Sequence, residues 1–103
     1  MRNVIAYAKA RGFLVYHTHI AKRSTEGFPD LVLVRDGRLI FAELKKEKPE
    51  KCSPSMHKKL DPTPAQTAWL EAITSVGYAG EKGIVSAYLW RPSDWPTIED
   101  VLR

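Results

Sequence analysis

Two acidic residues and a lysine stand at a spacing that suits phosphodiester chemistry. Asp30 is followed, after twelve intervening residues, by Glu43-Leu44-Lys45. The stretch between them consists of two apolar, β-prone runs separated by Asp36-Gly37, the pair of residues that favours a two-residue hairpin turn. The sequence therefore predicts a β-hairpin, with strands over residues 30–35 and 38–45, that carries all three side chains.

The predicted turn also gives the register of the hairpin. With residues 36 and 37 at the centre of the turn, each step outward pairs the next residue of each strand, so Asp30 lies opposite Glu43. Directly opposed residues of antiparallel strands point to the same face, with Cβ atoms about 5 Å apart. Two carboxylates held in this way repel each other. A divalent cation such as Mg²⁺ or Mn²⁺ offsets the repulsion, because it takes hard oxygen ligands.

Lys45 follows Glu43 by two residues, so strand alternation places it on the same face and turns Leu44 to the other side. Metal-assisted hydrolysis of a phosphodiester needs these groups: carboxylates that bind the ion, an ion that lowers the pKa of water, and a lysine that orients the water or stabilises the pentavalent phosphorane. The backbone carbonyl of Leu44 could supply a further metal ligand. In the opposite interpretation, Asp30 caps a loop and the other two side chains face solvent from an edge strand. The combined spacing on a predicted hairpin favours the catalytic interpretation.

The elements around the hairpin follow from hydrophobic periodicity and from turn and capping residues. They are a helix over 2–11, a strand over 13–20, a helix with Thr63 as N-cap, Pro64 at its first position and Gly77 just beyond its end, a strand over 84–90, and a capped helical turn at 97–100. The order α-β-β-β-α-β-α predicts one α/β domain over residues 1–103. Its mixed sheet of about four strands would be flanked by helices.

Composition limits the possible classes of protein. The chain has 103 residues, of which 44% are hydrophobic and 27% charged, as in a globular protein with one modest core. No apolar run approaches the roughly 18 residues that span a bilayer, and the start of the chain lacks the pattern of a signal peptide, so the cytoplasm is the expected compartment. The single cysteine, Cys52, excludes an internal disulfide and a zinc site of several thiolates.

The positive charge is concentrated in one stretch. Residues 45–59 contain six lysines and two glutamates, and their charge of +4 equals the net charge of the chain. Such a patch suits contact with a phosphate backbone, and a solvated charged loop is the alternative. Residues 46–62 are predicted to be a mobile loop. The expected DNA contacts are Lys46, Lys48, Lys51, Lys58 and Lys59 in this loop, and Lys22, Arg23 and Ser24 ahead of the hairpin.

Gln66 is a further candidate site residue. Leu70 and Ile73 follow it at four and seven residues, which places its side chain on the inward stripe of the helix. A buried amide needs hydrogen-bond partners. We favour an active-site role for Gln66 over the alternative, a hydrogen bond to backbone at the edge of the core.

Histidine and tryptophan side chains are assigned less specific roles. His17 and His19 share one face of a strand, but no further His or Cys ligand lies nearby in the sequence. We interpret them as ordinary strand residues, with His17 near the substrate. Trp69, Trp90 and Trp95 are interpreted as core or subunit contacts rather than base-stacking platforms, because no basic-aromatic alternation surrounds them.

The segments Gly27-Phe28-Pro29-Asp30-Leu31-Val32 and Phe41-Ala42-Glu43-Leu44-Lys45 resemble the PD-(D/E)XK nuclease superfamily. More narrowly, the chain resembles its VRR-NUC branch, small nucleases of phages, bacteria and structure-selective repair enzymes. The resemblance covers about residues 3 to 90. The further segments that carry it are Arg11-Gly12-Phe13-Leu14-Val15-Tyr16, Thr63-Pro64-Ala65-Gln66 and Gly77-Tyr78.

This resemblance implies a function and a set of site residues. Asp30 and Glu43 would be metal ligands, Lys45 the catalytic lysine and Gln66 an active-site residue that contacts the water or the phosphate. The implied activity is an Mg²⁺- or Mn²⁺-dependent endonuclease that hydrolyses DNA phosphodiester bonds, with branched or junction DNA as a candidate substrate. It would act in the bacterial cytoplasm, or in the host cytoplasm if phage-encoded.

The chain departs from the family pattern at one position. Family members usually carry an acid on the first helix, but here no Asp or Glu precedes Glu26, and Asn3 stands near that place. The metal shell could be completed by water, by another residue or by a segment that precedes this sequence. Otherwise, the expected activity is weak. The alternatives are therefore a DNA-binding module without catalysis, and an assembly subunit with a purely structural hairpin. A homodimer, formed by exchange of elements, would suit the cutting of both strands.

Overall fold

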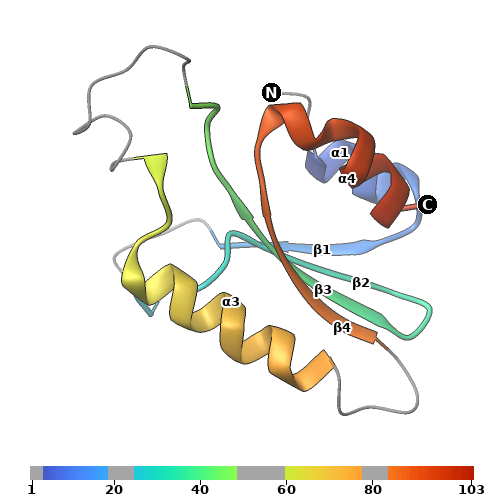
Figure 1. Cartoon of the computed structure of the whole chain (residues 1–103). Helices are drawn as coiled ribbons and strands as arrows, with labels where there is room; N and C mark the ends of the chain where they lie inside the picture. The colour runs from blue at the N-terminus through green and yellow to red at the C-terminus, as the bar shows by residue number, and fades with distance from the viewer. Residues whose placement is uncertain (1–3, 19–24, 49–59, 78–83) are drawn as a thin grey trace.

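A computed structural model of the chain describes residues 4–18, 25–48, 60–77 and 84–103. These residues form an α/β fold with a four-stranded mixed sheet in the order β1-β2-β3-β4 (Figure 1). The elements are α1 (Val4–Ala10), β1 (Leu14–His17), β2 (Leu31–Arg35), β3 (Arg38–Leu44), α3 (Pro64–Gly77), β4 (Ile84–Trp90), the 3₁₀ helix η1 (Pro92–Asp94) and α4 (Trp95–Val101). The predicted order of helices and strands is confirmed for the described residues.

The Asp36-Gly37 turn has the backbone conformation that its sequence favours. Both residues have positive φ angles, 47° and 77°, as a type I′ hairpin turn requires. β2 and β3 pair antiparallel from Arg35 opposite Arg38 to Leu31 opposite Ala42, which confirms the predicted register over the length of the ladder. β1 joins β2 antiparallel and β4 joins β3 in parallel, so the sheet is mixed.

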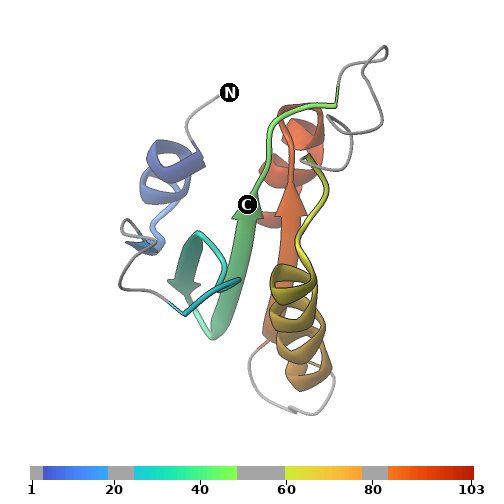
Figure 2. The same cartoon turned by 90° about the vertical axis from the view of Figure 1, so that its left-hand side faces the viewer.

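Helices cover both faces of the sheet. In Figure 1, α3 lies on one side of the strands and α1 and α4 lie together on the other; Figure 2 shows α3 running alongside β4. The main core forms between the sheet and the pair α1 and α4. Its buried residues are Val4, Ala8, Phe13, Leu31, Leu33, Ile40, Ala42, Trp90, Ile98 and Leu102. None of the described helices has the length and hydropathy needed to cross a membrane.

The hairpin turn also holds the C-terminal ends of α1 and α4. Arg35 donates hydrogen bonds to the carbonyl of Arg11 at 2.6 Å and to the carbonyl of Arg103. Arg38 donates to the carbonyl of Val101. Carbonyls at a helix C-terminus lack partners within the helix and carry partial negative charge, so guanidinium groups stabilise them. The two arginines thereby tie both terminal helices to one end of the sheet.

Two details bear on the sequence-based predictions. The last helix begins at Trp95, after η1, so the predicted turn at 97–100 starts too late: Asp94 is the N-cap residue, and Thr97 lies inside α4. The tryptophans pack within the fold, as interpreted from the sequence. Trp90 is 2% exposed, and Trp69 and Trp95 make edge-to-face ring contacts with Phe28 and Tyr7.

Candidate active site

The two acids meet where the β2–β3 ladder ends. The last ladder pair is Leu31 and Ala42, and the same register continued by one residue sets Asp30 opposite Glu43. The Asp30 carboxylate accepts a hydrogen bond from the backbone N–H of Leu44 at 2.9 Å, and its backbone carbonyl accepts one from Thr18 at 2.9 Å. Asp30 is thus fixed between the ends of β1 and β3, beside Glu43.

Glu43 is the one charged residue buried among those that the structure describes, at 4% exposure. Burial is the largest cause that raises its pKa, from 4.5 to about 8; the neighbouring Asp30 carboxyl raises it further, and Lys45 lowers it. The Glu43 Oε2 atom is buried and has no hydrogen-bond partner within the described part of the chain. When Glu43 is ionised, its buried Oε2 atom therefore carries negative charge without a hydrogen-bond donor, beside the carboxylate of Asp30.

These groups fit a hydrated divalent cation. The uncompensated Oε2 of Glu43 and the adjacent Asp30 carboxyl are hard oxygen donors, the ligands that Mg²⁺ and Mn²⁺ prefer. Residues 4–18, 25–48, 60–77 and 84–103 contain no group of three or more His, Cys, Asp or Glu side chains arranged to hold a metal ion. Mg²⁺ commonly keeps several waters in protein sites. Two carboxylates, with the Leu44 carbonyl as the predicted third ligand, are therefore sufficient protein donors.

Lys45 lies directly after β3 and extends the pairing with β4 by one residue. Its backbone N–H donates to the Trp90 carbonyl at 2.9 Å. The positive charge of Lys45 lowers the pKa of Glu43, so its ammonium group acts on the same carboxyl as Asp30 does. The structure thus brings together the three residues that the spacing singled out.

Gln66 reaches the acid pair from the first turn of α3. Its side-chain carbonyl accepts from the Thr63 backbone N–H at 2.9 Å, and the Thr63 hydroxyl accepts from the Gln66 backbone N–H at 3.2 Å, which is a reciprocal capping box. The Gln66 amide Nε2 donates to Glu43 Oε1 at 3.3 Å. Gln66 therefore bonds to backbone and also contacts Glu43, and its active-site role stays a prediction.

Gly27 is a positioning residue that residue types and spacing do not single out on their own. Its φ angle is +86°, and a Cβ atom built on it would lie 2.5 Å from the carbonyl carbon of Ala65. The loop before Asp30 therefore touches the backbone of the first turn of α3. This contact sets the distance between Asp30 and Gln66, and only glycine leaves room for it.

The predicted DNA-contact residues divide into two groups. Lys46 is exposed, and Lys48 forms an ion pair with Asp61. The rest lie outside the described residues: Lys22, Arg23, Ser24, Lys51, Lys58 and Lys59, together with His19 and Cys52.

His17 does not share the face of the acid pair. It pairs with Leu31 of β2, whose side chain belongs to the core under α1 and α4. Paired residues point to the same face, and Glu43 follows buried Ala42 by one residue, so Glu43 points to the face that α3 covers. His17 therefore points to the other face of the sheet from Glu43, and its place near a substrate stays a prediction.

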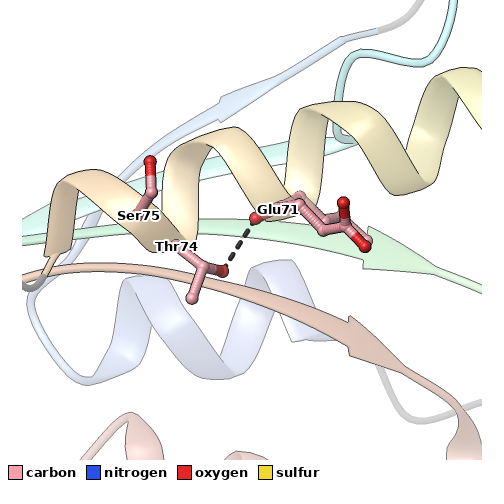
Figure 3. A pocket seen from close by; sticks show the side chains of 4 residues that line it. Glu71, Thr74 and Ser75 are labelled. Atoms are coloured by element: carbon pink, nitrogen blue, oxygen red, sulfur yellow. Dashed lines mark hydrogen bonds between the residues drawn. The ribbon is translucent and has the colours of Figure 1, made fainter.

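A hollow of about 450 Å³ lies on α3 and is lined by Leu70, Glu71, Thr74 and Ser75 (Figure 3). The Thr74 hydroxyl donates to the Leu70 carbonyl at 2.7 Å, the bond drawn dashed in Figure 3. The Ser75 hydroxyl donates to the Ala72 carbonyl at 2.7 Å. The hydroxyl groups of this hollow bond to their own helix, so they do not form a catalytic group.

Comparisons of the chain with protein-family models, with curated proteins and with solved structures found no match.

Proposed function

We propose that the chain is a VRR-NUC-type nuclease of the PD-(D/E)XK superfamily, which hydrolyses phosphodiester bonds in DNA with Mg²⁺ or Mn²⁺. The observation that carries the proposal is the acid pair of Asp30 and buried Glu43 at the end of the hairpin, beside Lys45. The four-stranded mixed sheet with helices on both faces is compatible with this superfamily.

Each residue of the site has a distinct task in this proposal. Asp30, Glu43 and the Leu44 carbonyl would hold the ion. When bound, a divalent cation lowers the pKa of water and neutralises charge on the phosphate. The Gln66 amide donates a hydrogen bond to Glu43 Oε1, which leaves Oε2 available to bind the ion. The Lys45 ammonium stabilises the negative charge that develops on the phosphoryl oxygens in the transition state.

Cleavage assays test the proposal directly. We expect the wild-type protein to cut plasmid, flapped or four-way DNA with Mg²⁺ or Mn²⁺ and to stop in EDTA. Asp30→Asn, Glu43→Gln and Lys45→Met should each lower the cleavage rate by at least about a hundredfold, since each removes a group that acts in the transition state. Glu71→Gln and Lys9→Met change the same charges at exposed positions of α3 and α1 and should cut normally.

The outcomes separate the competing functions. Equal cutting by all variants would assign the activity to another site or to a contaminant. Salt-sensitive DNA binding without metal-dependent turnover would identify a DNA-binding module, and the absence of nucleic-acid affinity at moderate salt would favour an assembly subunit. The predicted homodimer is tested by light scattering, where a monomeric mass would contradict it.

A further inference from the structure

A pocket of about 330 Å³ adjoins the candidate active site at the end of β3. It is lined by Leu44, Lys45, Lys46, Glu47 and Pro92. Lys45 belongs both to this pocket and to the candidate site, whereas the Leu44 side chain points to the other face of the sheet from Glu43 and packs against the core under α1 and α4. The volume lies at the small end of the range of about 300–1,000 Å³ that is typical of ligand sites. A group bound here would therefore reach the candidate site through Lys45.

The walls of this pocket are held in place by backbone contacts. Beyond the Lys45 bond to β4, the Lys46 carbonyl accepts from the Arg91 guanidinium at 2.6 Å. The Glu47 carboxylate accepts from the backbone N–H of Ser93, in η1 beside Pro92. Residues 45–47 are thus tied to β4 and η1 although they form no regular strand. Little conformational entropy is left to lose when a ligand binds, which favours affinity.

The lining combines apolar surface with two lysines and one glutamate, whose carboxylate is held by the Ser93 backbone N–H. Leu44 and Pro92 are apolar, and the lysine side chains add methylene stems. Of the three lysines in residues 45–48, Lys48 is paired with Asp61, whereas the ammonium groups of Lys45 and Lys46 make no ion pair with any described residue. Apolar walls accept the flat face of a nucleobase, and unpaired cations attract the phosphates on either side of it.

We propose that this pocket binds one unpaired nucleobase of the DNA strand that is cut, with Lys45 and Lys46 on the flanking phosphates. The assignment of the strand rests on the proposed nuclease function. A base inside a duplex must first be unpaired and unstacked, whereas a base in a single strand, flap or junction enters without that cost. The pocket therefore selects DNA with unpaired nucleotides.

Binding in EDTA, without turnover, tests the pocket in the wild-type protein. Fluorescence anisotropy would compare three labelled DNAs of about 15 nucleotides, within the span of known single-strand sites. They are a single strand, a strand of equal length with abasic sugars throughout, and a duplex. We expect the single strand to bind about tenfold more tightly than the abasic strand, which has the same phosphates but no bases. It should also bind more tightly than the duplex. Equal affinity for the normal and abasic strands would overturn the proposal, because phosphate contacts alone would then explain binding.

Two matched variants locate the effect. Pro92→Asp places a negative charge in the pocket wall at the first position of η1, where an acidic residue is tolerated. Pro96→Asp makes the same change at an exposed position of α4 outside the pocket. Pro92→Asp should lose the discrimination between normal and abasic strands, and Pro96→Asp should keep it. Discrimination kept by a folded Pro92→Asp protein would place base binding elsewhere. If Pro92→Asp fails to fold, Lys46→Met should weaken binding of all three DNAs, and unchanged affinity would contradict the phosphate contact.

The two proposals fail separately. Base discrimination in EDTA without cleavage in Mn²⁺ would leave the pocket standing and remove the nuclease activity. Metal-dependent cleavage without base discrimination would support the nuclease activity and contradict base binding in the pocket.

Discussion

Gln66 joins helix α3 to Glu43 through one side chain with two partners. Its amide nitrogen donates to Glu43 Oε1 at 3.3 Å, while its carbonyl oxygen is held by the backbone N–H of Thr63 at 2.9 Å. The capping box fixes which end of the amide faces the acid. The same contact that begins the helix therefore orients the buried carboxylate.

Separate variants divide these two roles of Gln66. Thr63→Ala removes the cap and should cost about 1 kcal/mol of unfolding free energy, but it leaves the Gln66 amide on Glu43 and should change the cleavage rate little. Gln66→Met removes the bonds of the Gln66 side chain to Thr63 and to Glu43 but keeps the Thr63 hydroxyl on the backbone N–H of residue 66. It should lower metal-dependent cleavage about ten- to a hundredfold, as expected for a group that orients a metal ligand. Urea unfolding and initial cleavage rates measure the two effects. Equal cleavage by the two variants would show that Glu43 needs no such orientation.

The raised pKa of Glu43 predicts how metal-free stability depends on pH. Its pKa is about 8 in the folded chain against 4.5 as the ordinary value, so between these values the native state holds a proton that the unfolded state has released. Raising the pH through this window therefore lowers the unfolding free energy, and the loss is complete above about pH 8. Below pH 4.5 both states are protonated, and Glu43 contributes no pH dependence.

Glu43→Gln should remove this contribution. In EDTA, the urea midpoint of the variant minus that of the wild type should grow from pH 5 to pH 8.5, since the variant avoids burying a charge. Glu71→Gln changes an exposed carboxylate and should follow the wild type. A constant difference across this range would contradict the raised pKa.

Metal binding should stabilise the folded chain, because the carboxyl pair forms only on folding. Mn²⁺ at a hundred times its dissociation constant is expected to add about 2.7 kcal/mol to the unfolding free energy. Asp30→Asn and Glu43→Gln should lose most of this gain. Differential scanning fluorimetry with and without Mn²⁺ measures it, with Glu71→Gln as the control. An equal rise in Tm for all four proteins would place the ion elsewhere.

Gly27→Ala should disturb the site through α3. The new Cβ atom would meet the Ala65 backbone at 2.5 Å at a φ of +86°. We expect a loss of about 1–3 kcal/mol and reduced cleavage, because the first turn of α3 must move away with Gln66. Gly12→Ala is the matched control: its φ is +89°, but the nearest atom is the Arg35 side chain at 3.6 Å. Urea unfolding should show the smaller loss for Gly12→Ala, and its cleavage at low temperature should be normal.

Arg35→Met should lower the free energy of unfolding without changing the cleavage rate. It leaves the carbonyls of Arg11 and Arg103 without their charged donor, which should cost about 1.5–3 kcal/mol. Arg103→Met removes an exposed ion pair with Asp100 and should change stability by less than about 1 kcal/mol. Thermal unfolding compares them. Cleavage well below Tm should be equal in both, because Arg35 lies at the turn end of β2 and the acids lie at its other end.

The parts of the site that follow from local chain conformation could be predicted from the sequence. The Asp36-Gly37 turn determines the pairing of the two strands, and this pairing brings Asp30 beside Glu43. Thr63 and Pro64 likewise mark the start of α3 through contacts within four residues. Each of these features depends on neighbours in the sequence, so residue types and spacing are sufficient.

Other parts depend on contacts between distant segments. The depth at which Glu43 is buried is decided by how α3 packs on the sheet, and the space at Gly27 is decided by Ala65. Periodicity also predicts an apolar face on α3 that includes Val76, yet Val76 is 56% exposed. The burial of a residue depends on what lies opposite it, which periodicity alone does not specify.

The position of α4 has a consequence for synthesis of the chain. Ile98 and Leu102 are fully buried against strands that precede them by more than fifty residues. While a ribosome is still adding α4, only α1 of these two helices can cover the face formed by Leu31, Leu33 and Ile40. The sheet can therefore reach its native packing only after residue 102 has left the exit tunnel, and until then part of the apolar face of the nascent chain stays exposed.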